Sequence, residues 1–366
     1  MEPRHVDVLL VGGGVAAARC ARTLRRGGFA GTIVLVGDEP TPPYNRPPLS
    51  KELLRDEVPD ELVLAEPAAW YERRAVELLL GVPATALDPG ERLVELADGT
   101  RVRYGSCLLA TGAAPRMPAF PAYLLRTLAD AHALRDASAD AASATVVGGG
   151  FIGVEVAASL AARGTAVRLL SGGDLLWGGA FGVAPSDWAA GVLRRAGVDV
   201  RFGADPEPAD GLVVAGIGVE PRAELAAAAG LAVDDGILVD GRQVTSAAGV
   251  LAAGDVARAH DRPRIEHWHA ARESGERAGL AILGQPVPAP HAPWIFSELG
   301  AAKLDAIGWP DPDAAEVELA PGVIGFTRGD TVVQVAILDG ALPVEPVRAL
   351  IERGGTLSEL AAAIIG

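Results

Sequence analysis

Hydrophobic residues along this chain occur in short runs that are separated by glycine-rich loops and helical stretches. Residues 6–11 are a β-branched run bounded by glycines, which predicts a strand buried on both faces of a sheet. A glycine loop and a helical stretch follow over residues 12–28, and residues 32–36 form the next apolar run. The order of strand, loop, helix and strand predicts a β–α–β unit.

The same pattern recurs in the stretch ATVVGGGFIGVEVAASLAARGTAVRLL, whose glycine loop begins at Gly148. Two such units in one chain predict two nucleotide-binding domains. Each unit is followed by an apolar strand that ends at a glycine, CLLATG in the first and GLVVAGIG in the second. A hairpin signal at Asp98-Gly99 precedes the first of these strands, whereas only residues 203–210 precede the second. We therefore predict that the second domain has lost the antiparallel flap of the first.

The remaining residues complete three predicted domains. Residues 236–255 predict short strands, a long helix ends at Gly284, and a proline-rich linker then leads to antiparallel strands and two terminal helices. These patterns predict an α/β protein with two Rossmann-like dinucleotide-binding domains and a small α+β C-terminal domain. The expected boundaries are residues 1–115 and 236–290 for the first domain, 116–235 for the second and 291–366 for the third.

The composition narrows the classes of protein and partner. The net charge of −15 argues against a general nucleic-acid binder, although a small basic patch could still dock an acidic protein. Cys20 and Cys107 lie far apart in segments that we expect to be buried, so we expect no disulfide framework and a cytoplasmic location. No apolar run approaches the roughly 20 residues of a membrane span, and glycines interrupt the first run, which argues against a signal peptide.

The first glycine loop has the pattern of a dinucleotide site. Gly12, Gly14 and Ala17 fit G-x-G-x-x-G/A, in which the first glycine permits a tight turn and the second lets the backbone approach a pyrophosphate. The start of the following helix adds positive potential. Asp38 follows the next strand, where an acid can accept hydrogen bonds from an adenosine ribose. A glycine pattern alone would be a weak signal, but this context makes it specific.

The second loop repeats the pattern with Gly148, Gly150 and Gly153. The strand after it ends at Ser171, where an acidic ribose ligand would be expected. No Arg or Lys occurs between Ser171 and Asp187 to bind a 2′-phosphate. We therefore expect NADH as the preferred coenzyme, bound without the help of an acid, and leave NADPH open.

The stretch PYNRPPLSKELL, residues 43–54, is unusual for the core of a soluble enzyme. Its consecutive prolines prevent a helix from running through the middle of the stretch. It nevertheless presents Arg46, Ser50 and Lys51 in a fixed order and ends by starting a helix. These features predict a stiff segment with a lysine at the start of the helix that follows it.

Two nucleotide domains in series, the elements LLATG and LAAGD, and the motif PYNRPPLSK together carry a family resemblance. From residue 6 to the C-terminus, the chain resembles the FAD-dependent ferredoxin reductases, a group that includes putidaredoxin reductase, rubredoxin reductase and the reductase components of Rieske-type dioxygenases. In this family the PYNRPPLSK motif lies against the flavin. Related disulfide reductases carry a redox cysteine pair in the matching region, and this chain has none. Electrons are therefore not expected to pass through a protein disulfide.

The resemblance implies roles for individual residues. Arg46 and Lys51 should contact FAD, and the lysine ammonium should stabilise negative charge as the flavin is reduced. Glu155 should pair with Lys51 and meet the nicotinamide, although a solvated helix face is the alternative for this residue. Asp255 should bond the ribityl chain of FAD, where the alternative is an ordinary loop aspartate.

The aromatic residues of the motifs EHWHAA and PWIFSELG belong to the same pocket by resemblance. Trp268 should form a wall of the flavin site, and Phe296 stands where relatives usually carry a second tryptophan, which leaves the choice of electron acceptor open. His260, His267 and His269 could suggest a metal, but no cysteine or acid completes a ligand spacing, so we expect no metal site.

The full expected site follows from the loop patterns and the resemblance together. The expected FAD contacts are Gly12, Gly14, Val15, Ala16, Ala17, Asp38, Glu39, Arg46, Lys51, Pro83, Ala110, Thr111, Gly112, Arg116, Gly254, Asp255, Trp268 and Phe296. The expected NAD contacts are Gly148, Gly150, Phe151, Ile152, Gly153, Glu155, Ser171, Gly216 and Gly218. Lys51 and Glu155 are the residues expected to act in the chemistry.

The favoured function is an FAD enzyme that takes electrons from NAD(P)H and passes them to an acidic ferredoxin or another small redox protein. The first alternative is a flavin oxidoreductase that acts on a small molecule in a biosynthetic pathway. The second is a flavoprotein without catalytic activity. We expect neither a nucleic-acid partner nor a membrane, and a homodimer is left open.

Overall fold

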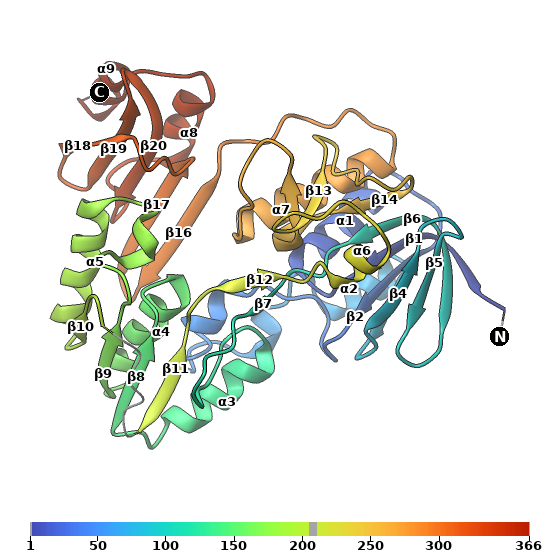
Figure 1. Cartoon of the computed structure of the whole chain (residues 1–366), viewed down its shortest axis with the longest axis horizontal. Coiled ribbons are helices and arrows are strands. Elements are labelled where there is room, and N and C mark those ends of the chain that lie inside the picture. The colour runs from blue at the N-terminus through green and yellow to red at the C-terminus, as the bar shows by residue number, and fades with distance from the viewer. Residues whose placement is uncertain (1, 205–210, 366) are drawn as a thin grey trace. The chain divides into compact units, whose positions relative to one another are not determined.

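The computed structural model describes residues 2–204 and 211–365 of the chain (Figure 1). The chain forms two compact units. The first consists of Met1–Asn45, Asp60–Ala114 and Glu220–Pro290, and the second of Arg46–Pro59, Pro115–Val219 and His291–Gly366. This division joins the expected second and third domains in one unit, which also takes residues 46–59. Residues 220–235 join the first unit.

The first unit is built on a sheet with the strand order β3-β2-β1-β6-β5-β4, in which β14 also pairs with β6 (Figure 1). Its strands are β1 (Arg4–Val11), β2 (Ile33–Gly37), β3 (Val76–Leu80), β4 (Ala84–Asp88), β5 (Leu93–Leu96), β6 (Arg101–Leu109) and β14 (Val250–Ala252). β1, β2, β3, β6 and β14 pair in parallel, whereas β4 and β5 form the antiparallel flap. The predicted hairpin at Asp98-Gly99 is confirmed, since it joins β5 to β6. The loops that follow the parallel strands gather at one edge of the sheet, where α/β proteins bind ligands.

Helices cover this sheet and complete the first unit. They are α1 (Val15–Arg26), α2 (Ala68–Arg73), α6 (Glu224–Ala228), α7 (Trp268–Ile282) and the short η2 (Asp60–Leu62) and η4 (Gly254–Val256). β13 (Ile237–Val239) pairs with β15 (Ala257–Ala259), and the chain crosses between the units at β7 (Ala113–Pro115) and β12 (Val219–Pro221). α7 packs directly on α1, because a Cβ at Gly275 would lie 2.2 Å from the Ala16 carbonyl oxygen. Only a glycine at position 275 allows this approach.

The second unit contains a parallel sheet with the order β10-β9-β8-β11. Its elements are η1 (Pro47–Ser50), α3 (Leu128–Ser138), β8 (Ser143–Val147), α4 (Phe151–Ala162), β9 (Ala166–Leu170), η3 (Leu176–Gly179), α5 (Val183–Arg195), β10 (Asp199–Arg201) and β11 (Leu212–Ala215). The repeated β–α–β unit predicted from the sequence is confirmed as β8, α4 and β9. The expected loss of the flap falls partly on residues 205–210, which lie outside the described residues. In the described part of the segment between β10 and β11 there is no strand.

The second unit also holds an antiparallel sheet with the order β16-β17-β20-β19-β18. Its elements are β16 (Trp294–Leu299), β17 (Ala302–Gly308), β18 (Ala315–Ala320), β19 (Val323–Arg328), β20 (Thr331–Leu338), α8 (Val344–Glu352) and α9 (Leu357–Ile365). Buried apolar residues of β20, α8 and α9 form its core, among them Val335, Val347 and Leu360. The expected strands and two closing helices are confirmed. No helix in the described part of the chain is long and apolar enough to cross a bilayer.

Candidate functional site

The first glycine loop joins β1 to α1 and has the geometry of an anion site. Gly12 has a φ of +125°, and a Cβ there would lie 2.1 Å from the Ala110 carbonyl oxygen, so only glycine fits. Gly14 caps the start of α1, and a Cβ at this position would meet nothing within 4 Å. The positive end of a helix thus faces open space beside exposed backbone. This arrangement fits the diphosphate of a dinucleotide such as FAD. Val15 begins α1, and Ala16 and Ala17 are buried next to the loop.

The expected ribose ligand lies at the neighbouring strand end. Asp38 directly follows β2 and forms an ion pair of 2.5 Å with Arg222, in which both side chains are partly exposed. Glu39 accepts a hydrogen bond of 2.5 Å from the Tyr44 hydroxyl. The Arg222 contact was not foreseen, because no local pattern links residues 184 positions apart in the chain.

Other expected FAD contacts gather at the same edge of the first sheet. Ala110, Thr111 and Gly112 follow β6, Gly254 and Asp255 follow β14, and Pro83 follows β3. The Thr111 hydroxyl donates to the Arg222 carbonyl at 2.7 Å, and the Gly254 amide donates to the Ser274 hydroxyl at 2.9 Å. Because these strands are parallel, their carboxyl ends bring the residues together with the glycine loop.

Trp268 begins α7 in the same unit. Its indole nitrogen donates to the Asn45 side-chain oxygen at 2.7 Å, and the Arg272 guanidinium lies over its ring at 4.4 Å from the centroid. The indole is therefore fixed from two sides by polar groups. His267 and His269 stack with ring centroids 5.9 Å apart. Among residues 2–204 and 211–365, no group of three or more His, Cys, Asp or Glu residues is placed to hold a metal ion.

The second glycine loop repeats this geometry in the second unit. Gly148 has a φ of +112°, and a Cβ at Gly153 would lie 1.8 Å from the Gly148 carbonyl oxygen. Gly150 caps the start of α4, and a Cβ there would find its nearest neighbour, the Gly216 carbonyl oxygen, at 3.7 Å. The loop therefore leaves space at the helix start, as the first loop does. Phe151 and Ile152 begin the helix, and the Gly218 carbonyl accepts from the Arg116 amide at 2.9 Å.

An aromatic cluster that the sequence did not suggest covers this loop. Trp177 has a φ of 56° and donates its amide to the Gly149 carbonyl at 2.6 Å. Its ring packs against Phe151 and Phe181 with centroid separations of 6.3 Å and 5.6 Å. The glycines that follow the tryptophan in LLWGGAFG were the available signal, since glycine-rich runs accompany unusual backbone. Ser171 is buried beneath this segment, and its hydroxyl donates to the Gly173 carbonyl at 3.1 Å.

Lys51 and Glu155 form a buried ion pair in the second unit. The lysine Nζ lies 2.8 Å from Glu155 Oε2, and the Ser50 hydroxyl donates to the same oxygen at 2.5 Å. The Ser297 hydroxyl donates to the other oxygen, Oε1, at 2.9 Å. The pairing expected by resemblance is therefore present, and Glu155 is buried rather than on a solvated helix face. The Ser50 and Ser297 contacts were not foreseen.

Three different elements place the members of this group. Pro47 and Pro48 open the short helix η1, which ends at Ser50 with Lys51 as its C-cap. Glu155 lies on the second turn of α4, and Ser297 lies in the middle of β16. The prediction for residues 43–54 was wrong in its detail, since it placed no helix in the middle of the stretch and a helix start at its end, whereas η1 lies in the middle and residues 51–59 form no helix. The segment nevertheless brings Lys51 to a carboxylate on α4.

Phe296 lies between the only two lysines of the sequence. The Lys51 and Lys303 ammonium groups are 5.6 Å and 6.0 Å from the centroid of its ring. Lys303 also pairs with Asp305 at 3.1 Å. Cation–π contacts of this kind stabilise ammonium groups away from bulk water. Arg46, the other cation of the motif, donates to the Arg126 carbonyl in the same unit.

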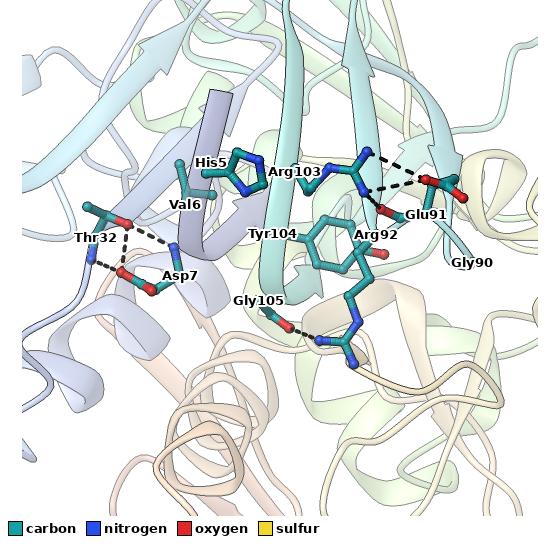
Figure 2. A pocket seen from close by; sticks show the side chains of 10 residues that line it. All are labelled: His5, Val6, Asp7, Thr32, Gly90, Glu91, Arg92, Arg103, Tyr104 and Gly105. Carbon is teal, nitrogen blue, oxygen red and sulfur yellow. Dashed lines mark hydrogen bonds and ion pairs between the residues drawn. The ribbon is translucent and has the colours of Figure 1, made fainter. Parts of the chain in front are cut away.

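Figure 2 shows a pocket of about 560 Å³ at the opposite edge of the first sheet. His5, Val6 and Asp7 lie at the start of β1, so the pocket faces the amino ends of the parallel strands. Its arginines are already engaged, since Arg103 pairs with Glu91 and Arg92 donates to the Gly105 carbonyl. Ligands of such sheets bind at the carboxyl ends, so this pocket is not the dinucleotide site.

The comparisons with known proteins agree with this geometry. Residues 6–275 match the pyridine nucleotide-disulphide oxidoreductase family. The chain is 35% identical to the biphenyl dioxygenase system ferredoxin–NAD(+) reductase component of Paraburkholderia xenovorans (strain LB400), over 92% of this chain and 88% of the relative. It is 34% identical to rhodocoxin reductase of Rhodococcus erythropolis, over 83% of this chain and 78% of the relative.

Solved structures give the same result. The fold matches putidaredoxin reductase in its covalent complex with putidaredoxin, with a TM-score of 0.90, 30% sequence identity and 98% of each chain covered. The ferredoxin reductase for the CYP199A2 system of Rhodopseudomonas palustris matches with a TM-score of 0.85 and 28% identity, over 98% of this chain and 99% of that one. The expected resemblance and fold class are confirmed, and the chain belongs to the pyridine nucleotide-disulphide oxidoreductase family, within its group of ferredoxin reductases.

Proposed function

We propose that this protein is an FAD-dependent reductase that takes electrons from NADH and passes them to a ferredoxin or another small iron–sulfur protein. The observation that carries the proposal is the buried pair of Lys51 and Glu155 in a chain with two separate dinucleotide loops. Relatives whose names specify ferredoxin reductases support the choice of acceptor.

The first loop and its neighbours would hold FAD. Gly12 and Gly14 would admit its diphosphate, Asp38 would accept from its adenosine ribose, and Thr111, Gly112 and Asp255 would line the rest of the cleft. Bound FAD supplies a centre that accepts a hydride and releases electrons one at a time. The second loop, with Gly148, Gly150 and Gly153, would bind the coenzyme that donates the hydride.

Lys51 would supply positive charge where negative charge develops during reduction. Glu155 holds its ammonium in place, and the Ser50 hydroxyl shares the same carboxylate oxygen. A charged donor fixed in a buried setting needs no reorganisation at the moment of reaction, which is what makes it effective.

The electrons would leave the protein without a dithiol step. Cys20 and Cys107 are fully buried in different hydrophobic cores of the first unit, and residues 43–54 contain no cysteine. An external one-electron acceptor therefore suits the site better than a protein disulfide. The two free thiols also support the proposal that the protein works in the cytoplasm.

The test is an anaerobic titration of the FAD-loaded protein with NADH and NADPH, followed by addition of a ferredoxin. We expect the purified protein to be yellow, NADH to bleach its absorbance near the visible maximum, and ferredoxin to restore that absorbance. A flavin that NADH does not bleach would support a flavoprotein without catalytic activity. Bleaching that no ferredoxin reverses would favour a small-molecule acceptor. Phe296 is consistent with that alternative, because it stands where relatives usually carry a second tryptophan.

A further inference from the structure

We propose that Ser297 is a positioning residue for hydride transfer: its hydroxyl fixes the Glu155 carboxylate and thereby holds the Lys51 ammonium. The inference rests on the proposed function for its catalytic meaning, but the contacts that carry it lie entirely within the second unit. They link β16 of the antiparallel sheet to α4 of the nucleotide-binding sheet.

The two oxygens of Glu155 have different donors. Oε2 accepts from the Lys51 ammonium and the Ser50 hydroxyl, whereas Oε1 accepts from Ser297. All four side chains are buried, and Ser297 is 0% exposed. Removing the Ser297 hydroxyl would deprive Oε1 of this donor. A buried carboxylate oxygen without a donor costs free energy, so the carboxylate would turn to share the lysine and shift its ammonium.

The position of Ser297 on its strand argues for a polar role. Ser297 and Leu299 are the buried residues of β16, and an apolar side chain would fill such a position at no polar cost. A hydroxyl buried at this depth is unfavourable unless it is hydrogen-bonded. Its bond to Glu155 is therefore what makes a serine acceptable at this place.

Adjacent residues of β16 contact both members of the ion pair. Ser297 donates to Glu155, while the ring of Phe296 lies 5.6 Å from the Lys51 ammonium. Ser50 adds a second link, because its carbonyl accepts from the Ser159 hydroxyl of α4 at 2.7 Å. The strand thus holds the carboxylate through a hydroxyl and the ammonium through an aromatic face.

The lysine content of the chain allows a direct test. Lys51 and Lys303 are the only lysines, so protein labelled with ¹⁵N-lysine gives two side-chain ammonium signals in NMR. Lys303 is 39% exposed, so we expect its ammonium protons to exchange quickly with water, whereas Lys51 is 5% exposed and hydrogen-bonded, so we expect slow exchange. The exchange rate is measured on the FAD-loaded protein without NADH. We expect Ser297→Ala to raise the proton-exchange rate of the Lys51 ammonium by about tenfold.

Two controls separate positioning from general loosening. Ser186→Ala removes another buried serine of the second unit, one that accepts from the Leu176 amide, and should leave the Lys51 signal unchanged. In a Glu155→Gln background the lysine has already lost its charged partner, so adding Ser297→Ala should change the exchange rate little further.

Three outcomes would overturn the inference. They are an unchanged Lys51 exchange rate in Ser297→Ala, an equal change in Ser186→Ala, or full additivity of Ser297→Ala with Glu155→Gln. The kinetic counterpart is a rate of flavin reduction by NADH about tenfold slower in Ser297→Ala at unchanged FAD content. If NADH does not reduce the wild-type flavin, the proposed function fails, while the NMR result still decides whether Ser297 positions the pair.

Discussion

The Lys51 ammonium lies 2.8 Å from the Glu155 carboxylate in a pair whose side chains are each 5% exposed. Burying two charges costs desolvation free energy that their attraction does not reliably recover. Such a pair therefore contributes little to the stability of the folded protein. Ser50 and Ser297 reduce that cost by donating to the carboxylate. The arrangement is better explained by a reaction that needs a fixed positive charge.

Lys51→Met should slow reduction of the bound flavin by NADH more than it weakens FAD binding. Under the proposed function the lysine charge acts where negative charge develops, so we expect a reduction rate lower by a factor on the order of 100. FAD affinity should change little, because the proposed contacts to the cofactor come mainly from the glycine loop and the strand ends. Stopped-flow reduction and FAD titration measure the two effects.

Lys303→Met is the matched control for this substitution. It removes the other lysine beside Phe296 but leaves the pair with Glu155 intact. We expect its reduction rate to stay near that of the wild type. Equal slowing in both variants would mean that the general positive potential, and not the placement of Lys51, supports the reaction.

Gly14→Ala should reduce FAD affinity without disturbing the fold. Gly14 has ordinary φ and ψ values, and a Cβ there meets no protein atom within 4 Å, so the methyl group would enter only the space proposed for the diphosphate. We expect an FAD dissociation constant about tenfold higher and a Tm of the apoprotein within about 2 °C of the wild type. Gly12→Ala should instead lower the Tm of the apoprotein, because its Cβ would clash with the Ala110 carbonyl. A Gly14→Ala protein with unchanged FAD affinity would place the diphosphate elsewhere.

Ser171→Glu should tighten NADH binding and weaken NADPH binding. The Ser171 hydroxyl already donates to the Gly173 carbonyl, whereas a carboxylate at this strand end could accept from both ribose hydroxyls. The gain should be about 1–3 kcal/mol in binding free energy for NADH. Ser171→Gln should give a smaller gain because its side chain lacks the charge.

In the wild type we expect NADH to react faster than NADPH. Arg168, the nearest cation in the sequence, pairs with Asp199 at 3.3 Å. Faster reaction of the wild type with NADPH would contradict this location of the ribose site.

Cys20 and Cys107 should not react with a thiol reagent in the native protein. Burial raises the pKa of both thiols, so the reactive thiolate is absent at pH 7–8 and the sulfur atoms are also inaccessible. Titration with DTNB should release no thionitrobenzoate until denaturant unfolds the chain, and NADH reduction should not change this result. Rapid labelling of the native protein would show that one hydrophobic core opens to solvent. It would then contradict the proposal that electrons leave the protein without a dithiol step.

Short stretches of sequence were enough to predict the two glycine loops and the order of the elements around them. These features are local: Gly12 and Gly148 need backbone angles that other residues avoid, and short β-branched runs next to glycines predict buried strands wherever they occur. The prolines before Lys51 are likewise a local feature, but the prediction that they keep the middle of the segment free of helix was wrong, because they open the short helix η1. Membership in the family followed from these motifs.

Which side chains complete the site depends on how distant elements pack together. The hydroxyl of Ser297 meets Glu155 across 142 positions of sequence, and Arg222 meets Asp38 across 184. Neither periodicity nor composition predicts such contacts, because they depend on how separate strands and helices pack in the folded protein. Serine and arginine are also ordinary surface residues, so their types alone carry no signal of burial or pairing. The local backbone is specified by short stretches of sequence, but the hydrogen bonds that fix the Lys51–Glu155 pair arise only when η1, α4 and β16 pack together.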